Sequence, residues 1–367
     1  MIPIVEFAVR KRIAEHTAPS TTRRNRLAKK VPRTRSGFPA PWFCAVTTEV
    51  ATAPLSPKEF TKPSILVAAV YATIVSVPTL LTVIDCGSLS AAAELISYTP
   101  SGVSRTIAAL ETELGFTLLY RSKKGVQPTR ECEELLPACR QLVFSGERLS
   151  QTAAKIRGAE CGTVVIGTAY SCYYQWITQM TSQIHSKYPG IQFRIINGTS
   201  TELIQKLHDH QLDFCIISAR EGNHSWIPFC SDPMVAMLPA DHPVTECEAV
   251  PVELFASEAY IETYPGQDVD NARIFSQCNI HPNTLFSTQD IYATYSMVEA
   301  GLGISMNNQI NSRLWNGTVC HLPLIPDLRM EIGMAYSSEV PPAAAVLLSE
   351  VQKLPPETIK TTLSAQK

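Results

Sequence analysis

Two helix signals separated by a tight turn follow Gly87, and they constrain the fold more than any other feature of the chain. Gly87 suits the end of an apolar helix, because glycine readily adopts the left-handed conformation there, and Ser88 can cap the next helix. After the turn, Thr99 is a second candidate cap, and Pro100 stands at the first helical position, where a missing N–H is tolerated. The pattern predicts two short helices joined by a turn.

The second helix has one apolar face, which carries Val103, Ile107, Leu110 and Leu114. The start of its opposite face suits entry into the DNA major groove and presents Pro100, Ser101, Ser104 and Arg105. Arg105 can read a guanine edge or contact a phosphate, and both interpretations stay open. A hairpin follows, with Arg121 before its turn and Lys123 and Lys124 within it, which indicates a basic wing. The ordered set predicts a winged helix-turn-helix that binds double-stranded DNA.

This stretch resembles the DNA-binding domain of the LysR-type transcriptional regulators. The matching residues are Ser88, Ser90, Ala92, Ala93, Leu95, Ser101, Val103, Ser104, Arg105, Ile107, Leu110, Glu111, Leu114, Gly115, Leu118, Arg121 and Thr129. The chain departs from the family pattern at Tyr120, Pro128 and Glu131–Cys132. The resemblance extends from about Leu80 to Val351 and adds Ser88 and Ser90 to the expected DNA contacts. It implies a cytoplasmic transcription factor that forms a dimer or tetramer, has RNA polymerase as a partner and needs no cofactor.

Residues 1–63 differ in composition from the rest of the chain. They carry twelve lysines and arginines against four aspartates and glutamates, whereas the remainder carries 19 against 29. They show no sustained helical or strand period, which predicts a disordered basic extension. Such an arm can add phosphate affinity, resembles a transit peptide, or is not part of the native protein; these interpretations stay open. The acidic remainder restricts any DNA contact to a local basic patch.

The 22 residues from Pro63 to Ile84 carry no charge, so by length they are a candidate membrane span. Pro78 interrupts the run, and its last third overlaps the first helix of the predicted DNA-binding domain. We therefore expect a helix of that domain and no membrane partner.

A long helical pattern follows Thr129, with apolar residues at alternating spacings of four and three. The seam consists of Leu135, Cys139, Leu142, Leu149, Ala153 and Ile156, with Gly146 as a weak point. Such a seam can pair two chains as a coiled coil, although a helix packed on its own domain would show the same pattern. The family resemblance favours dimerisation through this helix.

Beyond Cys161 short apolar strands alternate with helices, which predicts α/β lobes with parallel strands and helices on both faces. The chain is expected to cross to a second lobe and return, giving two Rossmann-like lobes that resemble the family's effector domain and periplasmic solute-binding proteins.

The fold expected overall is α/β with an all-α-type winged helix-turn-helix domain at its start. The expected divisions are a basic extension at 1–63, the winged helix-turn-helix at 64–130, a linker or dimerisation helix at 131–160, and an effector domain at 161–360, with lobe one at 161–218 and 307–360 and lobe two at 219–306.

Hydroxyl-bearing side chains recur where the expected strands end and helices begin. The candidate effector-binding residues are Thr168, Tyr170, Ser171, Thr199, Ser200, Thr201, Ser218, Thr288 and Gln289. Hydroxyls and free N–H groups at helix starts suit a small anionic ligand. Each residue alone could simply cap its helix, but recurrence at three strand ends favours a pocket.

Other functional classes find less support in the chain. The sequence contains none of the common hydrolase, zinc-protease or nucleotide-binding motifs, so we expect neither an enzyme nor a metal site. Eleven scattered cysteines without a C-x-x-C pair favour a reducing compartment, although a redox sensor using Cys172, or Cys230 with Cys247, stays open. The lobes alone would also permit a solute-binding or membrane-anchored ligand-sensing protein. The helix-turn-helix instead favours a transcription regulator whose promoter binding or activation responds to a small molecule.

Overall fold

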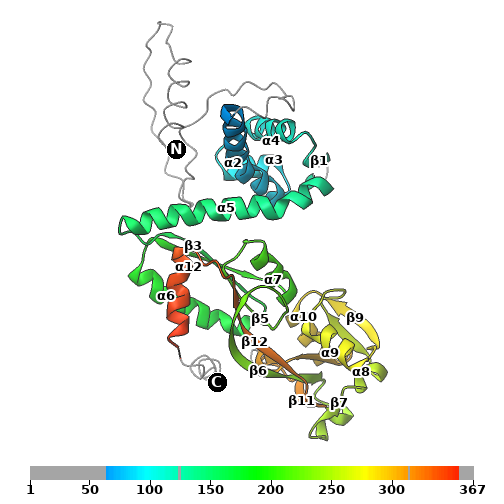
Figure 1. Ribbon diagram of the computed structural model, residues 1–367. Helices are drawn as coiled ribbons and strands as arrows, with labels where there is room; N and C mark the ends of the chain where they lie inside the picture. Colours follow the sequence, from blue (N-terminus) through cyan, green and yellow to red (C-terminus); the bar gives the residue numbers. More distant parts are fainter. Residues whose placement is uncertain (1–62, 123–124, 313–314, 355–367) are drawn as a thin grey trace, which may run out of the picture. The chain divides into compact units, whose positions relative to one another are not determined.

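The computed structural model describes residues 63–122, 125–312 and 315–354 (Figure 1). The expected basic extension, up to residue 62, and the wing residues Lys123 and Lys124 lie outside these ranges. Within them, no single helix has the length and hydropathy needed to cross a bilayer. Only Thr73–Cys86 and Leu89–Leu95 taken together meet that test, and these two helices are bent by 119°.

Three helices and a hairpin form the first described module. Their bounds are α2 Pro63–Cys86, α3 Leu89–Leu95, α4 Pro100–Leu114, β1 Leu119–Ser122 and β2 Gly125–Pro128. As predicted, Ser88 caps α3 by accepting from the N–H of Ala91, and Thr99 caps α4 by accepting from the N–H of Gly102. Pro78 lies inside α2, so the uncharged run belongs to one helix. The predicted winged helix-turn-helix is therefore present.

The core of this module joins all three helices and the hairpin. Its buried side chains are Leu80, Val83, Ala92, Ala93, Val103, Ile107, Leu110, Leu118, Leu119 and Cys132. The stripe predicted on α4 forms the centre of this core, and Leu114 packs against its margin. Small side chains at Ala92 and Ala93 let a neighbouring helix pack closely against α3.

The hairpin is tied to the helices by two sets of hydrogen bonds. Glu111 on α4 accepts hydrogen bonds from the N–H groups of Leu118 (2.8 Å) and Leu119 (3.3 Å). The N–H of Val126 donates to the carbonyl of Gly87 at 2.8 Å. A Cβ on Gly125 would lie 2.7 Å from that carbonyl oxygen, and the φ of Gly125 is +124°, so this position requires glycine.

The predicted long helix is α5, Arg130–Ile156, and the hydroxyl of Thr129 caps it by accepting from the N–H of Cys132. Leu135 and Cys139 pack against the core of the first module. Leu149 and Ile156, farther along the predicted seam, are 72% and 82% exposed. The second half of the seam is therefore exposed to solvent in a single copy of the chain.

An eight-stranded sheet in the order β4-β3-β5-β12-β6-β11-β7, with β10 also paired to β6, forms the framework of the larger domain. The bounds are β3 Gly162–Thr168, β4 Ile191–Asn197, β5 Phe214–Ser218, β6 Ser225–Leu238, β7 Val250–Pro251, β10 Ser305–Asn308, β11 Cys320–Ile325 and β12 Arg329–Tyr336. Strand β3 is parallel to β4 and β5, as predicted, whereas β12 is antiparallel to both β5 and β6. A separate parallel pair consists of β8 Tyr260–Thr263 and β9 Thr284–Thr288.

Helices cover both faces of the part of the sheet that contains β3, β4, β5 and β12, as the sequence predicted (Figure 1). On β5, Phe214 and Ile216 pack with α6 Tyr174–Lys187 and α12 Pro342–Gln352, whereas Cys215 and Ile217 pack with α7 Ser200–His208. Successive side chains of a strand point to opposite faces, so a strand covered on both faces is apolar throughout. The remaining elements are η2 Ser171–Tyr173, η3 Pro243–Glu246, α8 Leu254–Ser257, α9 Asp270–Cys278, α10 Ile291–Glu299 and α11 Gln309–Ser312.

Strand β6 is long enough to belong to two lobes. Residues 225–233 pair with β12, next to β5, whereas residues 234–237 pair with β10 and residues 235–238 with β11. We call the part built on β3, β4, β5 and β12 lobe one, and the part built on β7 to β11 lobe two. The expected lobe boundaries at 218/219 and 306/307 do not follow this pairing, because 225–233 lies in lobe one and 320–325 in lobe two.

Candidate functional site

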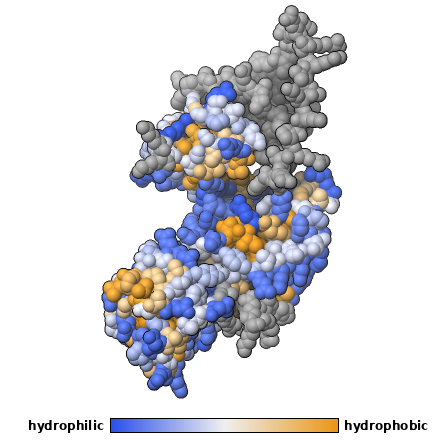
Figure 2. Space-filling model, turned by 180° about the vertical axis from the view of Figure 1, so that it is seen from behind, coloured by the Kyte–Doolittle hydropathy of each residue, from blue (hydrophilic) through white to orange (hydrophobic). Residues whose placement is uncertain are grey.

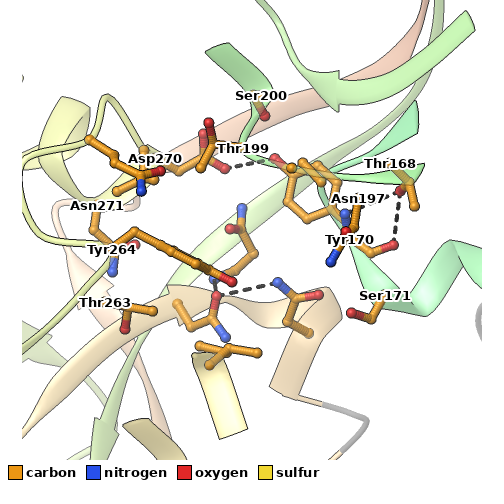
Figure 3. Close-up of a pocket in the computed structure, with 18 of the residues that line it drawn as sticks. Thr168, Tyr170, Ser171, Asn197, Thr199, Ser200, Thr263, Tyr264, Asp270 and Asn271 are labelled. Carbon is orange, nitrogen blue, oxygen red and sulfur yellow. Dashed lines mark hydrogen bonds between the residues drawn. The ribbon is translucent and has the colours of Figure 1, made fainter. Parts of the chain in front are cut away.

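A cavity of about 350 Å³ lies between the lobes. Residues of both lobes line it, including Asn307 and Asn308 on strand β10 of lobe two. Figure 3 shows Tyr170 from lobe one facing Asp270 from lobe two. Six of the nine predicted effector-binding residues line it: Thr168, Tyr170, Ser171, Thr199, Ser200 and Gln289. Thr201, Ser218 and Thr288 do not line it, although Ser218 lies directly behind the cavity wall through its bond to Asp270. This volume suits a small molecule.

The lobe-one side of the cavity follows from sheet geometry. Parallel strands β3, β4 and β5 end at one edge, and the turns after β3 and β4 begin at Thr168 and Asn197. The Thr168 hydroxyl accepts from the N–H of Tyr170 and donates to its carbonyl, which fixes the turn. Thr199 forms a reciprocal capping box with Glu202 at the start of α7. Thr199 therefore caps a helix and lines the cavity at once.

A buried ion pair connects the two lobes at this edge. The carboxylate of Asp270, the first residue of α9, accepts from the Tyr170 hydroxyl at 2.7 Å (Figure 3). It also accepts from the Ser218 hydroxyl. Arg220 Nη2 lies 3.3 Å from the same carboxylate, and the two charged side chains are 3% and 9% exposed. Burial, together with the adjacent carboxylate, raises the pKa of Tyr170 far above its usual value, so this hydroxyl stays a donor.

The sequence predicted hydroxyls here but no charged side chain, because Arg220 and Asp270 are 50 residues apart. The Arg220 guanidinium is held by several partners: Nε donates to the Thr201 hydroxyl at 3.2 Å, and Nη1 donates to the Ser218 hydroxyl at 2.6 Å. The polar cluster at this edge therefore includes a buried guanidinium, which the pattern of hydroxyls and helix starts did not predict.

Side-chain amides form much of the remaining lining, and sequence reasoning did not identify them. They are Asn197, Gln267, Asn271, Asn307, Asn308 and Asn311, in addition to Gln289. Asn271 Nδ2 donates to the carbonyl of Met306 at 2.6 Å, which ties α9 to β10. The buried atoms Gln267 Oε1 and Asn308 Nδ2 have no hydrogen-bond partner among the residues that the structure describes. The pair Asn307 and Asn308 at the end of β10 can be seen in the sequence. Their place in the cavity lining depends on where β10 lies in the folded chain.

Aromatic side chains complete the wall. Besides Tyr170, the lining contains Tyr174, Tyr264, Tyr292, Tyr295 and Trp315. Tyr295 and Trp315 are stacked with ring centroids 4.9 Å apart. The cavity therefore offers an apolar surface beside its polar groups, which is usual for small-molecule sites.

The predicted DNA-binding residues gather at the start of α4 and on the hairpin. Pro100, Ser101 and Arg105 are exposed on the first turns of α4, and Ser90 is exposed on α3. Arg121 on β1 donates through Nη1 to the Ser104 hydroxyl at 2.9 Å, so the wing and the helix present one continuous polar surface. Ser88 is engaged as the cap of α3.

The structure gives no support to a redox sensor that uses Cys172. Cys172 is buried in the core of lobe one and does not line the cavity. Among the residues that the structure describes, no group of three or more His, Cys, Asp or Glu side chains could hold a metal ion.

Comparison with known proteins agrees with this architecture. Residues 157–354 match the family described as LysR substrate binding domain, and residues 76–133 match bacterial regulatory helix-turn-helix protein, lysR family. The chain is 25% identical over 240 residues to the uncharacterized HTH-type transcriptional regulator YvbU of Bacillus subtilis, covering 65% of this chain and 82% of that protein. It is also 25% identical to AlsR of the same organism over 232 residues, covering 61% and 76%.

Two solved structures share the fold. A full-length OxyR variant from Pseudomonas aeruginosa has a TM-score of 0.57 at 20% identity and covers 80% of this chain and 94% of its own. CbnR in complex with its target DNA has a TM-score of 0.52 at 15% identity, covering 76% and 99%. The curated relatives are transcriptional regulators rather than enzymes, and the match to a helix-turn-helix disfavours a solute-binding protein. Because one family profile covers more than half of it, the chain belongs to the LysR family of DNA-binding transcriptional regulators with an effector-binding domain.

Proposed function

We propose that a small molecule bound in the interlobe cavity modulates promoter binding or activation by the winged helix-turn-helix. The observation that carries this proposal is the cavity itself, which residues of both lobes line together. A ligand that touches both lobes can favour one arrangement of the lobes over another, and only such differential contacts shift a conformational equilibrium.

DNA recognition is assigned to α4 and the wing. Arg105 is exposed in the second turn of α4, where a side chain of a groove-bound helix can reach a base edge or a phosphate. Arg121 and Ser104 are joined by a hydrogen bond beside it. We assign supporting contacts to the remaining predicted residues Ser88, Ser90, Pro100 and Ser101, and to Lys123 and Lys124.

The oligomer is assigned to the seam of α5. Leu149 and Ile156 are large apolar side chains exposed on one helix, and a second copy of α5 would bury them. Apolar side chains also gather on the exposed surface of lobe two (Figure 2), where Leu285, Phe286 and Tyr292 are exposed. Two such surfaces support a dimer that can assemble further into a tetramer, working in the cytoplasm with RNA polymerase as its functional partner.

The anionic character expected of the effector stays a prediction. The hydroxyl of Ser200 at the start of α7 supports it, since helix starts attract negative charge. The carboxylates of Asp270 and Glu202 in the same lining oppose it.

The proposal is tested by footprinting and fluorescence anisotropy on DNA upstream of the neighbouring divergent gene, with and without a panel of small acids and neutral metabolites. We expect at least one compound to change the affinity or the footprint of the full-length protein. The Ser200→Ala variant should respond more weakly to that compound while it keeps DNA affinity. A panel compound that acts equally on both proteins would show that it does not act through this cavity.

A further inference from the structure

The polar groups around Asp270 form a complete carboxylate-binding arrangement. Two hydroxyls, from Tyr170 and Ser218, and the guanidinium of Arg220 all converge from lobe one. The carboxylate that they hold comes from lobe two, at the start of α9. Charge-assisted hydrogen bonds of this kind are the strong ones in proteins, and here the guanidinium and the carboxylate are both almost fully buried.

This arrangement coincides with the place where the sequence predicted the effector's anion. Tyr170 and Ser200 line the cavity. The hydroxyl oxygens of Ser218 and Ser200 are 3.1 Å apart. The carboxylate of Asp270 therefore lies among the hydroxyls that were expected to bind a carboxylate of the ligand. A second carboxylate in the same corner would meet a like charge in a poorly solvated site.

We infer that this corner is an anion site which Asp270 fills from within the chain, so that the effector presents an uncharged polar group to it. The part of the inference that concerns the effector rests on the proposed function, whereas the self-occupied anion site does not. The rest of the cavity fits a neutral ligand, because uncharged amide side chains form much of its lining, among them Asn197, Asn308 and Asn311. A molecule that carries hydroxyl or amide groups can both donate to and accept from such side chains.

Chemical rescue of Asp270→Ala in the full-length protein tests this inference. Removing the carboxylate leaves a hole lined by the Tyr170 and Ser218 hydroxyls and an unpaired buried guanidinium, so the melting temperature should fall by about 5–15 °C. Sodium acetate at constant ionic strength should restore at least half of that loss. Acetamide, which has the same shape without the charge, should restore less than a quarter, and acetate should leave the wild-type melting temperature unchanged.

Asp268→Ala is the matched control. Asp268 lies two residues away and also contacts an arginine and a hydroxyl, Arg273 and Thr201, but its ion pair is about 40% exposed. Acetate should not rescue this variant, because the vacated space is open to water. Equal rescue of both variants would show a general salt effect and overturn the inference.

Asp270→Asn keeps the test decisive if Asp270→Ala folds poorly. An asparagine still fills the space, so acetate should not stabilise this variant, whereas refolding of Asp270→Ala in acetate should recover more folded protein than refolding in acetamide. No rescue, equal rescue by acetate and acetamide, or the same acetate effect in the wild type would each overturn the self-occupied site. Melting temperatures need no DNA, so a failure here is distinct from a failure of the effector-dependent footprint.

Discussion

The winged helix-turn-helix and the interlobe cavity are built by contacts of different range. In the first, a hydrogen bond such as that from the Gly102 N–H to the Thr99 hydroxyl spans three residues. In the second, the bond from Tyr170 to Asp270 spans 100 residues. Helix caps, turns and the proline at the start of α4 can be predicted from residues close together in the sequence. A site that joins two lobes exists only after the sheet has formed. The DNA-binding module is therefore specified by neighbours in sequence, and the cavity by topology.

The first prediction separates the cores of these two regions and carries the largest effect. Ile107 is fully buried in the centre of the helix-turn-helix core, so Ile107→Ala should lower the unfolding free energy of that module by about 2–5 kcal/mol. Hydrogen exchange should speed up in α3 and α4 but not in β3 or β5. Equal acceleration in the effector domain would show that the two regions unfold as one unit.

The second prediction concerns DNA affinity alone. Arg105→Ala removes an exposed side chain from α4 and should weaken operator binding by about 1–3 kcal/mol if Arg105 reads a base. Its melting temperature should stay close to that of the wild type. Fluorescence anisotropy with the operator and with unrelated DNA distinguishes base reading from a phosphate contact, since the latter weakens binding to both. Unchanged affinity for both DNAs would remove α4 from the assigned recognition role.

How far the sequence could predict the structure follows the same division. The caps at Ser88 and Thr99 were predicted because a hydroxyl and its N–H partner lie within three residues. The hydroxyls that line the lobe-one side of the cavity were predicted because parallel strands end at one edge. Arg220 and Asp270 were not, because nothing local marks two residues 50 apart as a pair. The lobe boundaries differed because β6 is one continuous strand that serves both lobes.

The third prediction compares two residues that the sequence treated alike. Ser200 lines the cavity, whereas Thr288 does not and accepts a hydrogen bond from the N–H of Asp290. Ser200→Ala should weaken the effector response by about 0.5–1.5 kcal/mol, the value of one hydrogen bond. Thr288→Ala should leave the response intact and alter only stability. Effector-dependent anisotropy and melting temperature measured on both variants provide the check, and a shared loss of response would place Thr288 in the site after all.

The fourth prediction, with the smallest effect, uses a partly buried carboxyl that belongs to the effector domain. Asp213 precedes β5, and its carboxylate accepts from the N–H of Val165 at 2.7 Å. Burial raises the pKa of Asp213 to about 6, and the hydrogen bond from Val165 opposes that rise only in part. Because this pKa lies above the unfolded value, the folded protein binds the proton first. The domain should therefore gain stability as the pH falls from about 6 towards 4, and the full burial cost of the charge applies above pH 6.

Between pH 7 and pH 5 this gain should amount to about 1 kcal/mol. Glu147, whose pKa burial also raises, contributes in the same direction, so the slope of the wild type alone does not isolate Asp213. Asp213→Asn keeps an oxygen to accept from Val165 and removes the titration. Urea unfolding of the effector domain at pH 7, 6 and 5 should show a smaller pH slope in this variant than in the wild type, by that amount. Identical slopes would mean that Asp213 stays ionised in the folded protein at every pH tested.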